Sequence, residues 1–321
     1  MIISELIAFA IPTYNRSKYL DVCLEKLINT IKEHNIKIYV SDNCSSDNTK
    51  EIVNKWQLSY KHLYYHRNET NLDMDGNFEK VLNLPNSKYV WLFGDTYEIE
   101  SNNLNYLLNL INSDTLSYDC IVFNLENIIS NPTKNYQEQN ELLIDLSGIM
   151  SCVSCLIYNQ DIIKNASFKR YRNTFFSLEA IIFEYIDNKD FIVHWAQNQS
   201  VKSLQIDNVV KKNWSNSLRM FEIGIEGWLK FIYSLPASYS LESKSKVEKL
   251  FVNNSGLLNY KGLLIRRIDG AINITLLISN FEKFIKVSSY TKFFYAFILC
   301  CVPKLVLKKI LLLTKILLRK N

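Results

Sequence analysis

Short apolar runs alternate with amphipathic segments over the first hundred residues, and this alternation constrains the fold more than any other feature of the chain. The runs that read as strands are 5–12, 36–43, 58–67 and 87–95. The segments with helical periodicity between them begin at Ser17, 49 and 76. Parallel strands need long crossover connections, whereas antiparallel neighbours can be joined by tight turns. The pattern therefore predicts a doubly wound, mostly parallel α/β sheet.

A cluster of polar residues follows each of these four strands. The loops read PTYNRS, SDNCSSDNT, RNETNLDMDGN and GDTYE. Open parallel sheets bind ligands beyond the carboxyl ends of their strands, so four polar loops at one edge favour a concave binding site over four solvated turns. The chain has eight glycines and neither G-x-G-x-x-G nor G-x-x-x-x-G-K-[ST], which argues against dinucleotide-binding and P-loop proteins.

The rest of the chain alternates less regularly. We expect helices at 102–112 and 175–186 and mainly helical structure from about residue 211. The runs that read as further strands are 118–125, 152–159 and 191–197. With 321 residues, the chain is long enough for one large domain or two small ones.

The seven scattered cysteines favour a reducing compartment, since a chain of this length buries a core without disulfides. Cys152 and Cys155 form a C-x-x-C without a second pair or a histidine at metal spacing, so buried strand cysteines are favoured over a zinc site. The N-terminal apolar stretch contains Glu5 and no basic residue precedes it, which indicates a first strand rather than a signal peptide. We therefore expect a cytoplasmic protein.

The net charge of +5 conceals an asymmetry along the chain. Residues 283–321 carry nine Lys or Arg and no Asp or Glu, which gives +9, while the preceding residues carry 28 bases and 32 acids, which gives 28 − 32 = −4. A mildly acidic body argues against a nucleic-acid partner. A cationic, leucine-rich tail suits an anionic lipid surface.

Residues 292–321 are the segment for which we expect membrane association. The uncharged run 293–303 is too short to span a bilayer. The basic residues that share one face of a helix here are Lys304, Lys308, Lys315 and Arg319. A narrow cationic stripe on a leucine-rich cylinder predicts a helix that lies in the plane of a membrane surface. A terminal helix docked on the domain, with its lysines outward, is the alternative.

The segments IAFAIPTYNRSKYL, VSDNCSSDNT, RNETNLDMDGNF and KYVWLFGD, in this order, resemble the family 2 glycosyltransferases of the GT-A fold. Within that family they are most similar to abequosyltransferase and other O-antigen deoxysugar transferases. The resemblance is strong over residues 5–100 and weak beyond. It implies a Rossmann-like GT-A domain at 1–230, with a nucleotide-sugar-binding half at 1–100 and an acceptor half at 101–230. A helical region at 231–321 would follow.

The resemblance implies that the first loop lines the nucleotide site of a sugar donor. The residues concerned are Pro12, Thr13, Tyr14, Asn15 and Arg16. Asp42 would accept a hydrogen bond from the base, because a ring N–H or exocyclic amine can only donate there; an Asx turn or helix cap is the alternative. Asn71 and Asp75 would lie around the donor, and Asp75 could instead be the N-cap of the following helix.

The chain departs from the family after the fourth strand. The family's signature there is a run such as GDDD, whose carboxylates hold Mg²⁺ or Mn²⁺ against the donor pyrophosphate. In this chain Gly94 and Asp95 are followed by Thr96, Tyr97 and Glu98. Asp95 is thus the candidate metal ligand, and Glu98 on an extended segment would point to the other face. Cation-free or weakened catalysis and an inactive site are the alternatives.

An inverting transferase also needs a general base for the acceptor hydroxyl. In this fold the base usually lies at the start of a helix in the second half, where Glu179 is the candidate catalytic residue. Glu184 would be turned well around the same helix. A surface role for Glu179 is the alternative, and His194 is a second candidate base that more typically would be a packed residue.

Taken together, these features predict a glycosyltransferase that moves a sugar from a nucleotide-sugar donor to a lipid-linked saccharide. The product would belong to a bacterial surface polysaccharide such as O-antigen or capsule, made at the inner face of the cell membrane. The alternative is a non-catalytic homologue that binds nucleotide sugars or acts as a scaffold, with a degenerate metal site.

Overall fold

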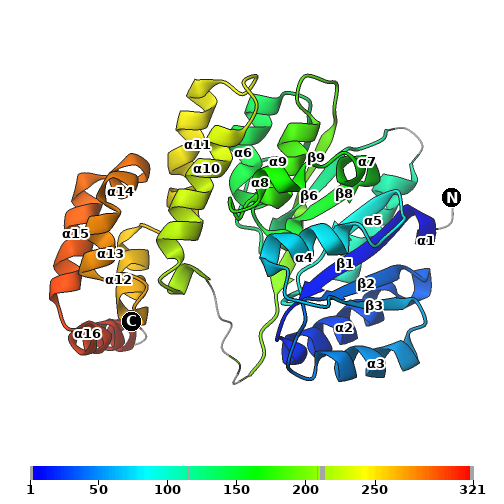
Figure 1. Ribbon diagram of the computed structural model, residues 1–321, viewed down its shortest axis with the longest axis horizontal. Coiled ribbons are helices and arrows are strands. Elements are labelled where there is room, and N and C mark those ends of the chain that lie inside the picture. The colour runs from blue at the N-terminus through cyan, green and yellow to red at the C-terminus, as the bar shows by residue number, and fades with distance from the viewer. Residues whose placement is uncertain (1–2, 114–115, 208, 210–213, 319–321) are drawn as a thin grey trace. The chain divides into compact units, whose positions relative to one another are not determined.

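A computed structural model describes residues 3–113, 116–207, 209 and 214–318. The chain forms two compact units. The first comprises residues 1–208 together with 235–238, and the second comprises residues 209–234 and 239–321. Figure 1 shows a sheet flanked by helices in the first unit and only helices in the second.

The first unit is built on a mixed sheet with the order β3-β2-β1-β4-β8-β6-β9-β5, and β7 pairs with β9. The strands are β1 Ile7–Thr13, β2 Lys37–Asp42, β3 Leu63–Arg67, β4 Tyr89–Leu92, β5 Tyr97–Glu98, β6 Cys120–Leu125, β7 Lys134–Tyr136, β8 Leu156–Asn159 and β9 Val193–Ser203. The first four strands are parallel, as predicted. The second half mixes directions, because β8 is antiparallel to both β4 and β6.

The helices of the first unit cover the sheet. They are α1 Ile3–Leu6, α2 Ser17–Ile31, η1 Lys32–His34, α3 Thr49–Ser59, α4 Asp73–Leu82, α5 Ser101–Asn112, α6 Gln139–Met150, η2 Val153–Cys155, α7 Gln160–Lys164, α8 Phe168–Tyr171 and α9 Ser177–Tyr185. Of these, α2, α3 and α4 begin after the loops that follow β1, β2 and β3. Figure 1 shows α2 and α3 on one side of the β1–β3 sheet and α4 on the other. The apolar face predicted for α2 is buried from Leu20 to Ile31, so its 3.6-residue periodicity identified the packing surface.

A cluster of aromatic rings holds the centre of the sheet. Phe9 stacks on Trp91 at 5.1 Å between ring centroids, and Trp91 meets Phe123 edge to face at the same distance. All three side chains are fully buried. Each such pair adds about 0.5–1.5 kcal/mol to the energy of burial, so β1, β4 and β6 form a rigid base for the loops at their carboxyl ends.

Two predicted strands begin later than the sequence indicated. In the expected strand 58–67, the first two residues belong to α3, which ends at Ser59. Tyr60 then terminates the helix, since its side chain is buried and its hydroxyl donates to the carbonyl of Ile36 at 2.5 Å. The strand β3 starts only at Leu63.

The expected strand 152–159 begins with a turn, so the interpretation of Cys152 and Cys155 as strand cysteines was wrong. Cys152 precedes the 3₁₀ turn η2 and Cys155 ends it, and only Cys155 is buried. The η2 turn places Ser154 where it contacts residues at the end of β4. The indole N–H of Trp91 donates to the carbonyl of Ser154 at 2.8 Å, and the N–H of Gly94 donates to the Ser154 hydroxyl at 2.9 Å.

The second unit is helical throughout its described part. Its elements are η3 Trp214–Asn216, η4 Glu222–Gly227, α10 Trp228–Ser234, α11 Leu241–Asn254, α12 Tyr260–Asp269, α13 Ile274–Ser279, α14 Phe281–Val287, α15 Tyr290–Cys301 and α16 Lys304–Leu318. The division between the units falls after Asn208, whereas we expected it at residue 230. The reason is that the intervening helices pack within the second unit: Trp228 stacks on Phe251 at 4.2 Å, and Glu226 pairs with Lys283 at 2.6 Å.

The predicted tail consists of two helices, α15 and α16, with Pro303 between them. Leu307 is buried, and the Arg267 guanidinium of α12 donates to carbonyls at the end of α15. The tail is thus docked along one side. Within the expected cationic stripe, the side chain of Lys315 and all of Arg319 lie outside the described residues. None of the helices in the described residues is long and apolar enough to cross a membrane.

Candidate functional site

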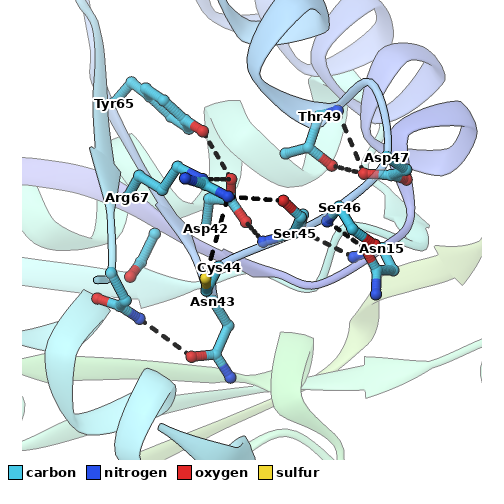
Figure 2. Close-up of polar contacts among 12 residues, drawn as sticks. Asn15, Asp42, Asn43, Cys44, Ser45, Ser46, Asp47, Thr49, Tyr65 and Arg67 are labelled. Atoms are coloured by element: carbon cyan, nitrogen blue, oxygen red, sulfur yellow. Dashed lines mark hydrogen bonds and ion pairs between the residues drawn. The ribbon is translucent and has the colours of Figure 1, made fainter. Parts of the chain in front are cut away.

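The loops that follow β1 and β2 are joined by hydrogen bonds (Figure 2). Asn15 adopts a left-handed conformation with φ of 51°, its N–H donates to the Ser45 hydroxyl at 2.9 Å, and its side-chain oxygen accepts from the N–H of Ser46 at 2.8 Å. The first N–H of α2, from Ser17, donates to the Asp47 carboxylate at 2.8 Å. Ser17 is thus the first residue of α2. A carboxylate from the neighbouring loop satisfies this helix N-terminus.

Asp42 lies at the end of β2, and its side chain is fully enclosed, with 1 % exposed. One carboxylate oxygen accepts from the N–H of Ser45 at 2.8 Å, and the other accepts from the Tyr65 hydroxyl at 2.6 Å and lies 3.4 Å from Nε of Arg67 (Figure 2). Burial, and then the bond to Asp42, raise the pKa of the Tyr65 hydroxyl. Two carboxylate oxygens offer about four acceptor positions, and these three contacts use most of them.

A network of asparagine side chains connects this loop to the one after β3. Asn43 donates to Asn71 at 2.9 Å and accepts from Asn68 at 3.1 Å, and Asn68 also donates to Asn77 at 3.0 Å. Asn77 in turn accepts from the Ser41 hydroxyl at 2.7 Å. Asn71 thus belongs to the network that joins these two loops, and its contact with a donor stays a prediction. The sequence analysis missed Asn43, Asn68 and Asn77, although asparagines repeated within two polar loops were an available signal.

Asp75 joins the loop after β3 to the start of α9. It lies in the first turn of α4, so it is not the N-cap that we considered. One oxygen accepts from the Ser177 hydroxyl at 2.8 Å and the other from the N–H of Asn173 at 3.3 Å. Burial raises the pKa of Asp75, although these hydrogen bonds act in the opposite direction. Asp75 therefore connects the two halves of the unit.

The loop after β4 presents Asp95, whose residue is 2 % exposed. The Thr13 hydroxyl donates to one carboxylate oxygen at 2.8 Å, and Nη1 of Arg16 lies 3.2 Å from the other. Around these residues Pro12 is buried within β1 and Tyr14 is 45 % exposed. Residues of the first and last predicted loops thus meet at one carboxylate.

Gly94 fits tightly beside the η2 turn. A Cβ on Gly94 would lie 3.0 Å from the Tyr97 ring and 3.3 Å from the Ser154 hydroxyl. A larger residue would push Asp95 away from Thr13 and Arg16.

The side chains around Asp95 do not fit a divalent cation. No group of three or more His, Cys, Asp or Glu side chains that could hold a metal occurs in the described ranges. Glu98 forms an ion pair with Lys26, and the Tyr97 hydroxyl lies 3.7 Å from the Cys152 thiol. One carboxylate and phosphate oxygens can suffice for Mg²⁺, but the permanently charged Arg16 guanidinium already lies against Asp95 and would repel a cation.

Glu179 lies in the first turn of α9 and is 1 % exposed. Burial, and then the nearby Cys152, raise its pKa well above the ordinary range. Its Oε1 atom has no hydrogen-bond partner among the described residues. The alternative of a surface glutamate is wrong, because all residues of α9 from Ser177 to Phe183 are buried. An enclosed carboxyl with an unsatisfied oxygen calls for a functional explanation.

His194, the other candidate base, is a packed residue. One ring nitrogen lies 2.8 Å from the Tyr106 hydroxyl and the other 2.6 Å from the side-chain oxygen of Asn135. Burial lowers its pKa to about 4. Both nitrogens are engaged by side chains, so His194 holds β9 against its neighbours.

The family follows from comparison with known proteins. Residues 8–183 match the family described as Glycosyl transferase family 2, and the chain belongs to it. Among characterised relatives, abequosyltransferase RfbV of Salmonella typhimurium is 38 % identical over 117 residues, which are 36 % of this chain and 35 % of that protein. A Campylobacter jejuni GalNAc(5)-diNAcBac-PP-undecaprenol beta-1,3-glucosyltransferase is 25 % identical over 58 % of this chain and 61 % of that protein. The chain thus matches less than two thirds of each of these relatives.

Solved structures with the same fold have low sequence identity to this chain. Staphylococcus aureus TarS 1–349 in complex with UDP-GlcNAc matches with a TM-score of 0.57 at 14 % identity, over 88 % of this chain and 81 % of that one. The mannosyltransferase PcManGT of Pyrobaculum calidifontis, in complex with GDP-Man and Mn²⁺, matches with a TM-score of 0.53 at 11 % identity, over 93 % and 86 % of the two chains. The GT-A fold predicted from the sequence is therefore confirmed.

Proposed function

We propose that this protein transfers a sugar, with inversion, from a nucleotide-sugar donor to a saccharide acceptor. One observation carries the proposal: the polar loops after the four parallel strands form a single hydrogen-bonded site at the carboxyl edge of the sheet, with Asp42 and Asp95 enclosed within it. Ligands bind at this edge in open α/β sheets. Membership in family 2 and the donors named for the solved relatives, UDP-GlcNAc and GDP-Man, support a nucleotide sugar.

The donor lies across the loops in this proposal. Asp42 accepts from the base, while Pro12, Thr13, Tyr14, Asn15 and Arg16 line the nucleotide. Gly94 and Asp95 approach the diphosphate, and Asn71 fixes the loop beside it. Support comes from the short hydrogen bonds that already hold these loops together, since a preorganised site loses little conformational freedom on binding.

Glu179 acts as the general base in this proposal. It accepts the proton of the acceptor hydroxyl as that oxygen attacks the anomeric carbon. A carboxyl whose pKa is raised by burial is a stronger base than an exposed one. The unsatisfied Oε1 supports the role, whereas both oxygens of Asp75 are engaged, one by Asn173 before α9 and the other by Ser177 at its first position. Asp75 is therefore assigned as a positioning residue.

The acceptor in this proposal is a lipid-linked saccharide of a bacterial surface polysaccharide, such as O-antigen. The protein would then be cytoplasmic and bind the anionic inner face of the cell membrane. The names of the two characterised relatives support such an acceptor. The second unit also exposes large apolar side chains on α15 and α16 beside lysines. The apolar residues are Tyr290, Phe294, Ile298, Leu305, Val306, Ile310 and Leu312.

Binding and turnover of nucleotide sugars test the proposal. Calorimetry with UDP-, GDP-, CDP- and dTDP-sugars should find a donor, and substitution Asp42→Asn should weaken its binding by roughly 1.5–3 kcal/mol, as expected for a hydrogen bond to a charged group. The unfolding transition of the variant serves as the control, because Tyr65 and Arg67 lose a partner. Binding without hydrolysis or transfer to any acceptor would favour the non-catalytic homologue.

A further inference from the structure

Asp95 is the carboxylate at which the sequence led us to expect a divalent cation. Both of its oxygens already have partners, with the Thr13 hydroxyl 2.8 Å from Oδ2 and Nη1 of Arg16 3.2 Å from Oδ1. The Asp95 side chain is 3 % exposed, whereas that of Arg16 is 45 % exposed. The accessible charge at this place is consequently the positive guanidinium rather than the negative carboxylate.

The remaining donors of Arg16 are not committed. Nε and Nη2 make no hydrogen bond or ion pair with any described residue, so only one of the three guanidinium nitrogens is engaged, by Asp95. A guanidinium is planar, always charged and carries five N–H donors that match phosphate oxygens in pairs.

We propose that Arg16 takes the place of the cation: it binds the diphosphate of the donor and stabilises it as the leaving group, so that donor binding does not depend on a metal. Asp95 acts as a positioning residue that holds the guanidinium. The inference rests on the proposed function. In the transfer step, the bond between the anomeric carbon and the diphosphate oxygen breaks, and its electron pair leaves with the nucleoside diphosphate. The acceptor oxygen bonds to the anomeric carbon and its proton passes to Glu179.

The other side chains near Asp95 agree with this assignment. The two positions after Asp95 carry no carboxylate: Thr96 is buried, and Tyr97 packs beside Gly94. Glu98 is paired with Lys26. A cation at Asp95 would have to displace Arg16 and leave its guanidinium without this partner, whereas a diphosphate can bind the free nitrogens without breaking any described contact.

Calorimetry with the nucleoside diphosphates UDP, GDP, CDP and dTDP tests the proposal on the full-length protein. In EDTA at least one should bind, and replacing EDTA by Mn²⁺ or Mg²⁺ should change its Kd by less than about threefold. Arg16→Gln should weaken binding in EDTA by about tenfold or more, since a charge-assisted bidentate contact is lost. Lys26→Gln removes the same charge from the ion pair with Glu98 instead of the one with Asp95, so it is the matched control and should leave Kd unchanged.

A double variant distinguishes two roles of Arg16: binding of the diphosphate, and neutralisation of the Asp95 carboxylate. Arg16→Gln leaves a buried carboxylate unpaired, so its unfolding transition is measured alongside, and Arg16→Gln/Asp95→Asn removes that carboxylate. The proposal predicts that the double variant folds and still binds poorly. Recovery of binding in the double variant would overturn it, as would binding that requires Mn²⁺ or Mg²⁺ and is abolished by Asp95→Asn alone. If no nucleoside diphosphate binds with or without metal, the proposed function itself fails.

Discussion

At the scale of single residues, the enclosed carboxylates of the site differ in their hydrogen-bond partners. Donors hold both oxygens of Asp42 and of Asp95. Glu179 is equally enclosed, but Oε1 lacks a partner among the described residues. An ionised group in such surroundings loses its hydration without compensation, so burial raises the pKa of Glu179.

This difference predicts how stability depends on pH. The pKa of Glu179 is raised in the folded state above the ordinary value of 4.5. The folded protein therefore binds more protons than the unfolded chain above pH 4.5, and the stability that Glu179 contributes is lost as pH rises through the raised pKa. Thermal unfolding of Glu179→Gln, which is neutral at every pH, should change less between pH 5 and pH 8 than that of the unsubstituted protein. An equal pH dependence in both proteins would contradict this assignment.

The same variant tests catalysis. A general base contributes about 10²- to 10⁴-fold to the rate, so Glu179→Gln should lower kcat by that amount and leave the donor Kd unchanged. Glu184→Gln is the matched control, since Glu184 lies on the same helix and pairs with Arg170 at the surface. A normal kcat of the Glu179→Gln variant would show that another residue acts as the general base.

At the scale of elements, a hydrogen bond across 102 positions of sequence connects α4 to α9. Asp75 accepts from Ser177, which is the first residue of α9 and precedes Glu179 by two positions. The donor loop and the candidate base are thus held in one geometry. Displacement of a catalytic group by about 1 Å can reduce a rate by about a hundredfold, so this connection should influence turnover.

A double-mutant cycle measures that connection. Asp75→Ala and Ser177→Ala should each lower kcat, and the double variant should be no worse than Asp75→Ala, because both substitutions remove the same bond. The coupling energy in unfolding should be about 1 kcal/mol. Arg172→Gln is the control: its ion pair with Glu79 joins the same two regions, but it is exposed and is expected to contribute little. Strictly additive effects on kcat would show that Asp75 does not act through Ser177.

Much of the first half of the site could be predicted from the sequence, because parallel topology brings the carboxyl ends of β1, β2 and β4 to one edge. The loops that carry Asp42, Asp95 and Arg16 meet as that rule requires, whereas the roles of the three residues are implied by the resemblance to the family and stay predictions. The contact of Asp75 with Ser177 could not be predicted, since periodicity within a segment does not reveal which distant loop lies beside it. The burial of Glu179 was missed for a related reason: Cys152 and Tyr158, which lie near its carboxyl, belong to other segments of the chain.

At the scale of the whole molecule, membrane binding by residues 292–321 could be tested by deleting them, but the packing of the second unit makes that deletion a poor test. Phe293 and Leu299 of α15 and Leu307 of α16 are buried. Large buried side chains typically contribute 2–5 kcal/mol each when truncated to alanine, so removal of residues 292–321 would disrupt this unit whatever its role. Substitutions confined to exposed positions avoid that problem.

Tyr290, Phe294 and Ile298 offer such positions, because they lie one turn apart along α15 and each is about 61 % exposed. Burial in a lipid interface would yield about 1.5–3 kcal/mol for each side chain, and nearby lysines such as Lys308 would add about 1 kcal/mol each at an anionic surface. The triple substitution to serine should therefore release the protein from vesicles of phosphatidylglycerol and phosphatidylcholine in a sedimentation assay, with its unfolding transition retained. Leu58→Ser, at a 90 % exposed position of α3, is the control and should not affect sedimentation.

High salt should weaken the binding to vesicles only in part, because salt screens the lysines but not the apolar contacts. If the unsubstituted protein ignores anionic vesicles, the exposed face of α15 does not bind lipid and the proposed location at the membrane fails, while the donor site in the first unit is unaffected.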